Sequence, residues 1–496
     1  MRKWWPLVAV CTGAFMLLVD VTIVMVALPD IAGDLGTSFS ALQWVMDVYA
    51  LVLAAMLLGA GSLADLTGRR RTYVAGLALF ALASLACGLA PNIGTLIAAR
   101  GLQGLGAAAM YATTMALLNT TYRGRDRGVA FGVWGAINGA AAAAGPIAGG
   151  LLTQHFGWRS IFLVNLPISL VAIVLTLRAF QESRNPRARG LDVPGMLTFA
   201  AAAAAITYAL IRATEDGWGS GVVLGLLAAG LAALALFVAV ELRSDDPMLD
   251  LSLFRGRAFT GIMIGAALLT AAAFAYLAYV SLWLQTVLGL DAVQAGLVML
   301  PMSVTAFVVA AAAGRLLHDA PPGRVVGIGL LIIGAGAFAQ AVLTAGSGWA
   351  ALLPGLAIVG LGVGVASPSL SSAAMASVPQ ERGGMAAGAV NTFRQLGFAF
   401  AVAILGGIFH SGVADGLDGL DSGGPGAGAA ALISGRAHAA AGQGHGQVVR
   451  EAFAHGLNVT MVAAGVLGVV AGLIVLALVR TSVRAPAEPE GADASR

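Results

Sequence analysis

Charged side chains inside apolar segments are the first candidates for chemistry in this sequence. Asp20 lies within the first apolar stretch, Asp47 about five residues into the second and Arg100 several residues into the fourth. An Asp–Arg pair between helices would offset much of the cost of burying each charge. A carboxylate so placed can also exchange a proton as its surroundings change between wet and dry. The alternatives are a static salt bridge for Asp20 and a position at headgroup level for Asp47.

A second candidate is the stretch 135–152, GAINGAAAAAGPIAGGLL, which is apolar and consists almost entirely of small side chains. Gly145 and Gly149 are four residues apart, so in a helix they share a face that lets two membrane helices bring their backbones into contact. Pro146 removes a backbone donor and should bend the helix. The pattern predicts a sliding or hinging surface, which we expect to meet the opposite half of the protein. Ordinary close packing is the alternative.

The segment 61–71, GSLADLTGRRR, concentrates an acid, two glycines and three arginines at a helix end. Asp65 could cap the start of the following span or pair with an arginine on a neighbouring helix. Either contact could form in one conformation and break in another, which would make the segment a latch. Plain positive-inside topology is the alternative. The candidate latch residues are Gly61, Asp65, Gly68, Arg69 and Arg70.

Aromatic, methionine and amide side chains within the spans could line an apolar substrate cavity, although packing would explain each of them equally. These candidates are Trp44, Gln103, Met110, Tyr111, Phe274 and Tyr276. No metal site is expected, because the two cysteines fall inside apolar segments and the histidines at 438 and 445 lack ligand spacing.

The elements that must position these residues are membrane helices. The chain has 496 residues, of which 59% are hydrophobic and 10% charged, whereas soluble domains carry about 25% charged residues. Lys3 is the only lysine, so the sequence has no phosphate-binding P-loop, which needs a lysine after its glycines. We therefore expect a polytopic membrane protein without a cofactor and without a P-loop ATPase of its own, so that any pumping uses another energy source. No nucleic-acid partner is expected, because the basic residues sit in loops between apolar segments.

About 20 apolar residues span a bilayer as a helix, and this rule predicts fourteen spans. With the N-terminus in the cytoplasm, 21 of the 27 basic residues fall on the inside and four outside, and Arg100 and Arg394 lie within spans. This bias predicts that both termini are cytoplasmic. The predicted spans are 6–28, 42–63, 72–90, 94–118, 129–152, 159–180, 193–213, 220–241, 259–287, 293–316, 324–345, 349–376, 385–410 and 455–479.

A loop pattern that occurs twice in the sequence predicts two halves of six helices each. The loop at 61–69 reads GSLADLTGR, and a degenerate copy at 314–324 reads GRLLHDAPPGR. Parallel repeats of this kind are one of the known transporter architectures. The predicted organisation is an N-terminal bundle at 1–190, two inserted helices at 191–257, a C-terminal bundle at 258–480 with a long external loop at 411–454, and a disordered cytoplasmic tail at 481–496.

Five segments in order resemble the major facilitator superfamily, and in particular its fourteen-helix drug:proton antiporters. The segments are Leu18 to Pro29, Gly61 to Arg71, Leu96 to Ala108, Gly139 to Leu152, and Gly157 to Pro167. The fourth of them resembles the antiporter motif that exporters carry and importers of the superfamily generally lack. Within it, the matching residues include Gly139, Gly145, Pro146, Gly149 and Gly150. Two departures are Met25, where the family usually has Asn, and Leu66, where a basic residue is common.

The resemblance implies an all-α fold of two six-helix bundles plus two inserted helices, alternating access, and proton-driven efflux of drug-like amphipathic molecules. It makes Asp20 and Arg100 candidates for proton coupling, to which depth adds Asp47. It likewise makes Asp65 and Arg69 latch residues. We expect a non-enzymatic protein of the cytoplasmic membrane that works as a monomer. The alternatives are a dedicated exporter of one endogenous metabolite or antibiotic and, much less favoured, a membrane-embedded enzyme or receptor.

Overall fold

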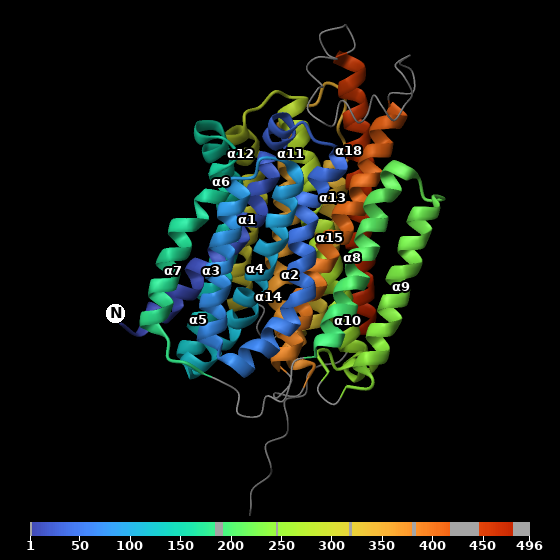
Figure 1. Ribbon diagram of the computed structural model, residues 1–496. Helices are drawn as coiled ribbons and strands as arrows, with labels where there is room; N and C mark the ends of the chain where they lie inside the picture. The colour runs from blue at the N-terminus through green and yellow to red at the C-terminus, as the bar shows by residue number, and fades with distance from the viewer. Residues whose placement is uncertain are drawn as a thin grey trace, which may run out of the picture.

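The structure is a computed structural model that describes residues 2–183, 192–244, 247–316, 320–378, 383–416 and 446–479. Within these ranges every regular element is a helix. Most helices run the full height of the molecule, up and down in turn (Figure 1). We call the end that carries the N-terminus and the turn at Gly68 the N-terminal rim, and the end that carries the turns at Gly36 and Gly157 the distal rim.

The helices form an N-terminal half, an inserted pair and a C-terminal half. The N-terminal half consists of η1 (Arg2–Trp4), α1 (Trp5–Leu35), α2 (Phe39–Thr67), α3 (Arg69–Gly88), α4 (Ile93–Thr121), α5 (Gly124–Phe156), α6 (Ser160–Leu163) and α7 (Asn165–Ala179). The inserted pair is α8 (Val193–Asp216) and α9 (Gly221–Glu241). The C-terminal half consists of η2 (Leu251–Arg255), α10 (Arg257–Phe274), α11 (Leu277–Thr286), α12 (Ala292–Leu316), α13 (Pro322–Gln340), η3 (Trp349–Leu352), α14 (Leu353–Ala376), α15 (Gly383–Gly416) and α18 (Gly446–Leu478).

Each of the fourteen predicted spans coincides with one helix or one interrupted helix. Twelve helices among the described residues are long and apolar enough to cross a membrane. The other two long helices, α4 and α5, have 29 and 33 residues and complete the fourteen. Two spans are interrupted, one between α6 and α7 and one at Ala275 and Tyr276 between α10 and α11.

Glycines allow the helices of each half to approach closely. In the N-terminal half, a Cβ added at Gly104 of α4 would lie 2.6 Å from the carbonyl oxygen of Tyr49 in α2. In the C-terminal half, a Cβ at Gly334 of α13 would lie 2.8 Å from the carbonyl oxygen of Gly465 in α18. Such separations admit no side chain, so backbone-to-backbone packing of small residues holds both bundles together, as is usual in membrane helices.

The inserted helices form a hairpin at the edge of the molecule (Figure 1). Helix α8 packs on α2 and α15, and so touches both halves, while α9 packs on α8. The rings of Phe199 and Phe237 join the two helices at a centroid distance of 5.2 Å. Leucines and valines cover the outer faces of α9 and are exposed, which is what a helix bordered by lipid requires.

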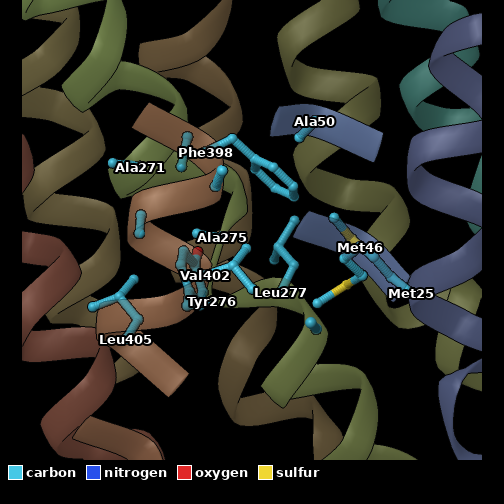
Figure 2. Close-up of a cluster of buried hydrophobic side chains, with 14 of the residues drawn as sticks. Met25, Met46, Ala50, Ala271, Ala275, Tyr276, Leu277, Phe398, Val402 and Leu405 are labelled. Carbon is cyan, nitrogen blue, oxygen red and sulfur yellow. The ribbon is translucent and has the colours of Figure 1, made fainter. Parts of the chain in front are cut away.

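The two halves meet along α2 with α15 and along α5 with α12. Figure 2 shows the apolar part of this interface, where Met25 and Met46 of the N-terminal half face Leu277 and Phe398 of the C-terminal half. Toward the distal rim the contact becomes polar. The Gln43 side-chain amide donates to the carbonyl oxygen of Val402 at 3.3 Å. The two halves are thus joined on the distal side of their interface.

The predicted external loop begins and ends in helix in this structure. The external loop was predicted at 411–454, but α15 continues to Gly416 and α18 begins at Gly446, so both ends of that segment are helical. The apolar pattern marks only the part of a helix that lies in lipid, whereas the helices extend beyond it. The remainder of this loop, with both of its histidines, and the predicted tail at 481–496 lie outside the described residues.

Candidate functional site

A network of polar side chains lies inside the N-terminal half, centred on Asp20 of α1. The Asp20 carboxylate accepts three hydrogen bonds from three different residues. Arg100 of α4 donates through Nη1 at 2.5 Å. Gln103 of α4 and Asn165 of α7 donate through their side-chain amides, each at 2.9 Å. The carboxylate therefore ties three helices together at one point.

The guanidinium group of Arg100 also makes several contacts with its neighbours. Its Nε donates to the carbonyl oxygen of Val45 in α2 at 3.0 Å, and its Nη1 also donates to Gln103 Oε1 at 2.7 Å. The Tyr49 ring lies over the guanidinium carbon at 4.3 Å, within the range of a cation–π interaction. Arg100 therefore brings α2 into the network as a fourth helix.

Ser84 of α3 completes the network as a hydrogen-bond acceptor for Gln103 at 2.8 Å and for Asn165 at 3.3 Å. The side chains of Asp20, Arg100, Gln103, Ser84 and Asn165 are all at least 98% buried. A buried ion pair is tolerated only where additional hydrogen bonds satisfy both partners, and this network supplies them. A proton arriving at Asp20 would remove the charge that holds Arg100, and would loosen contacts between five helices together.

Asp47 does not join this network, although it was expected at the same depth. It is completely buried in α2, and neither of its carboxylate oxygens has a hydrogen-bond partner. Asp47 lies one helical turn from Gln43, on the face of α2 that meets the C-terminal half. The reason for the separation is helix rotation, because α2 turns Val45 toward Arg100 and Asp47 away from it. The role of Asp47 in proton coupling stays a prediction.

The glycine face of α5 packs within its own half. A Cβ at Gly145 would collide with Oγ1 of Thr22 in α1, and one at Gly149 would lie 3.0 Å from the carbonyl oxygen of Ile23. The expectation that this face meets the opposite half is wrong, because the bare side of α5 is occupied by α1. Other residues of α5 contact α12 across the interface. Gly150 is buried, and the side-chain positions of Gly139 and Pro146 lie outside the described part of the chain.

The turn between α2 and α3 is capped by a residue that the sequence did not reveal. Gly68 has φ 116°, a conformation that favours glycine. The Glu182 carboxylate, which follows α7, accepts from the backbone N–H groups of Arg70 and Arg71 at 3.1 and 3.2 Å. A carboxylate at a helix N-terminus is favoured by the helix dipole. Glu182 therefore caps α3, whereas the expected cap or arginine partner, Asp65, has a side chain outside the described part of the chain.

Other parts of the predicted latch are less constrained. The Arg70 guanidinium donates to the carbonyl oxygen of Phe180 at 3.0 Å, and the backbone N–H of Arg69 donates to Ser183 at 3.0 Å. A Cβ at Gly61 would meet no atom within 4 Å. The Asp65 side chain lies outside the described part of the chain. The turn therefore connects α3 to the end of α7, while its function as a latch stays a prediction.

Most of the predicted cavity residues are used inside a bundle. Met110 and Tyr276 are fully buried, and Tyr276 Oη accepts from Gln340 of α13 at 2.9 Å. Trp44 packs edge-on against Tyr208 of the inserted helix α8 at 5.7 Å. In this structure these side chains serve as packing, and their assignment to a substrate cavity stays a prediction. The amide of Gln103 takes part in the Asp20 network, and its place in a cavity likewise stays a prediction.

Two of the predicted cavity residues are only partly buried. Phe274 ends α10 and packs against the core that spans both halves. Tyr111 of α4 packs against a core cluster of the N-terminal half. These two positions remain candidates for contact with a substrate.

Comparison with known proteins identifies the family. The sequence matches the family model of the Major Facilitator Superfamily over residues 10–402. The chain belongs to this superfamily. It is 38% identical over 405 residues to Multidrug resistance protein Stp of Mycobacterium tuberculosis, covering 81% of this chain and 75% of that protein. It is 34% identical over 418 residues to the Tetracenomycin C resistance and export protein of Streptomyces glaucescens, covering 84% and 77%.

The fold agrees with that of the Major Facilitator Superfamily. The human organic anion transporter MFSD10 (TETRAN) superposes with a TM-score of 0.62 at 13% sequence identity, over 95% of this chain and 99% of that one. At this identity the likeness concerns the fold alone. The chain is therefore an all-α, multi-pass membrane protein of the major facilitator fold, with its Asp20 network inside one of two helical halves.

Proposed function

We propose that this Major Facilitator Superfamily protein exports drug-like amphipathic small molecules in exchange for protons. The single observation that carries the proposal is the closed Asp20 network, in which one carboxylate holds an arginine and two amides in an otherwise apolar bundle. A family member with such a site can couple a proton to a rearrangement of helices. The resistance functions named for the relatives support export of drugs as the direction and cargo.

In this mechanism the proton acts on helix α1. Protonation of Asp20 neutralises the partner of Arg100, and α1 is then free to shift relative to α4 and α7. Thr22 and Ile23, on the next half-turn of α1, are packed against the bare glycine face of α5. A shift of α1 is therefore transmitted to α5, and α5 in turn contacts α12 of the other half. The chain of contacts connects the proton site to the interface between the halves.

The contacts between the halves would act as the distal gate. Gln43 of α2 reaches the carbonyl oxygen of Val402 in α15, and Gln285 of α11 reaches that of Val26 in α1 at 3.0 Å. The Gln43 amide also donates to Tyr279 Oη of α11 at 3.5 Å. All of these hydrogen bonds are neutral, and bonds of this kind contribute only about 0.5–1.5 kcal/mol each. A small free-energy change at Asp20 can therefore favour their opening, as alternating access requires.

The N-terminal rim is proposed to face the cytoplasm, and the protein to lie in the cytoplasmic membrane as a monomer. The distribution of arginine supports this orientation, because most basic residues flank the ends of helices at that rim. In this orientation the distal gate opens to the outside, and substrates leave through it.

The test uses everted membrane vesicles with an imposed pH gradient and a fluorescent cationic dye. Vesicles with the unaltered protein are expected to accumulate the dye, and an uncoupler is expected to abolish this. The Asp20→Asn variant, inserted at equal level, is expected to show no gradient-driven uptake. Uptake that is insensitive to the uncoupler, or normal uptake by Asp20→Asn, would overturn proton coupling.

A second candidate is a dedicated exporter of one endogenous metabolite or antibiotic. The observation that favours it is the likeness to a protein named for resistance to, and export of, one compound, tetracenomycin C. A susceptibility panel of chemically unrelated compounds separates the two functions. Protection against several unrelated compounds supports broad efflux, whereas protection against one compound alone supports the dedicated exporter.

A further inference from the structure

The C-terminal half contains a second arginine within a span, Arg394 of α15. Its side-chain partners differ in kind from those of Arg100. The Arg394 Nη2 donates to Ser367 Oγ of α14 at 3.0 Å. Its backbone carbonyl accepts from Thr270 of α10 at 2.6 Å, which fixes the position of the residue. Among the described residues no carboxylate lies within 4 Å of the guanidinium, whereas Arg100 is paired with Asp20.

An arginine inside a membrane protein without an acidic partner needs another explanation. Charged side chains in spans almost always pair, or face the interior of the bundle or a water-filled path. Arg394 is only partly buried, in contrast to the fully buried Arg100. Its guanidinium carries five N–H donors, and within the described part of the chain Ser367 accepts from one of them. As far as the described residues show, the other donors are left for water or a bound molecule.

The neighbours of Arg394 place it at the interface between the halves. Phe398 lies one helical turn further along α15, and Figure 2 shows its ring directed toward Ala50 of α2. Thr392, two residues before Arg394, donates to the carbonyl oxygen of Ala54 in α2 at 3.4 Å. Arg394 thus lies on the part of α15 that packs against α2 of the other half.

We propose that Arg394, held by Ser367 and one helical turn from Phe398, is a recognition site for an acidic oxygen on an aromatic substrate. A carboxylate is the ligand whose geometry matches a guanidinium best, through two parallel hydrogen bonds. A phenolate or enolate oxygen would use the same donors singly. The ring of Phe398 would pack against the apolar part of such a molecule. The site selects weakly acidic aromatic compounds among the amphipathic molecules that the protein would otherwise export.

This inference rests on the proposed export function, and it gives that function a substrate class. Arg100 is less suited to the same recognition, because its charge is paired with Asp20 and its Nε and Nη1 already donate to the Val45 carbonyl, Asp20 and Gln103. Arg394, by contrast, has no carboxylate within 4 Å among the described residues.

The test measures binding to the purified full-length protein in detergent. The probes are a panel of aromatic carboxylic acids and phenols, each paired with its neutral methyl ester or methyl ether. The unaltered protein is expected to bind at least one acid about tenfold or more tightly than its neutral partner, as one charge-assisted hydrogen bond provides. Arg394→Gln is expected to remove this preference and to leave the binding of the neutral partner within about twofold. Arg394→Lys is expected to retain part of it, because lysine keeps the charge without the planar fork.

The matched control is Arg212→Gln, which removes an arginine that is paired with Asp216 at the end of α8. It is expected to leave the acid preference unchanged. Two results would overturn the inference: an unaltered protein that binds no acid better than its neutral partner, or an acid preference that persists in Arg394→Gln. Failure of the export function would appear separately, as absent gradient-driven uptake in vesicles of the unaltered protein.

Discussion

Replacing Asp20 by Asn should destabilise the N-terminal half, and the structure allows the size of the effect to be worked out. The carboxylate accepts from Arg100, Gln103 and Asn165. An asparagine offers one oxygen in place of two, so at least one donor loses its acceptor, which costs about 1–3 kcal/mol. Arg100 also loses its counter-ion, and breaking a buried pair in this way typically costs about 3–5 kcal/mol in total.

The double variant Asp20→Asn with Arg100→Gln separates the cost of an unpaired charge from the cost of lost hydrogen bonds and packing. With both charges removed, no uncompensated ion remains, so the double variant is expected to recover at least about half of the stability lost by Asp20→Asn. Recovery of half of about 3–5 kcal/mol sets the interaction energy of the cycle at no less than about 1.5–2.5 kcal/mol, to which the cost of Arg100→Gln alone is added. The assay is reversible denaturant unfolding in mixed micelles for the four proteins of the cycle. If the two single changes add to within about 0.5 kcal/mol, the reasoning that Asp20 and Arg100 form one charge-balanced unit is refuted.

Three further predictions follow from the packing and the caps. Gly145→Val is expected to abolish transport without affecting membrane insertion, because its side chain would displace Thr22 and with it α1. The control is Gly225→Ala in α9, where a Cβ meets no atom within 4 Å, and it should transport normally. Glu182→Ala is expected to lower the unfolding free energy by about 1 kcal/mol, since it removes the cap of α3; an unchanged denaturant midpoint would exclude this role. Tyr276→Phe is expected to cost about 1 kcal/mol of stability and to leave substrate affinity unchanged in a binding titration, whereas a changed affinity would return Tyr276 to the substrate path.

Depth in the membrane could be predicted from the sequence, and helix rotation could not. The count of apolar residues placed Asp20 and Arg100 at the same level, and the structure joins them. The same count placed Asp47 there, but the rotation of α2 turns it toward the other half. These helices are apolar on nearly every face, so hydropathy does not indicate which face meets which neighbour.

Some residues of the Asp20 network and of the α3 cap could not be predicted from the sequence. Ser84 and Asn165 are ordinary small polar residues in apolar helices, and only the arrangement of α3 and α7 around Asp20 brings them together. Glu182 lies 112 residues after Arg70, in the first turn of the helix that it caps. A cap contributed from another part of the chain has no local signature, whereas Asp65 was suggested by its nearness in sequence.

The most direct test of the central claim follows protons and substrate in the same proteoliposomes. A pH indicator is trapped inside, no gradient is imposed, and an exported compound is added outside. The unaltered protein is expected to move protons in the opposite direction to the compound. Asp20→Asn is expected to exchange labelled for unlabelled compound across the membrane while moving no protons. Substrate-dependent proton movement by Asp20→Asn would contradict the assignment of proton coupling to Asp20.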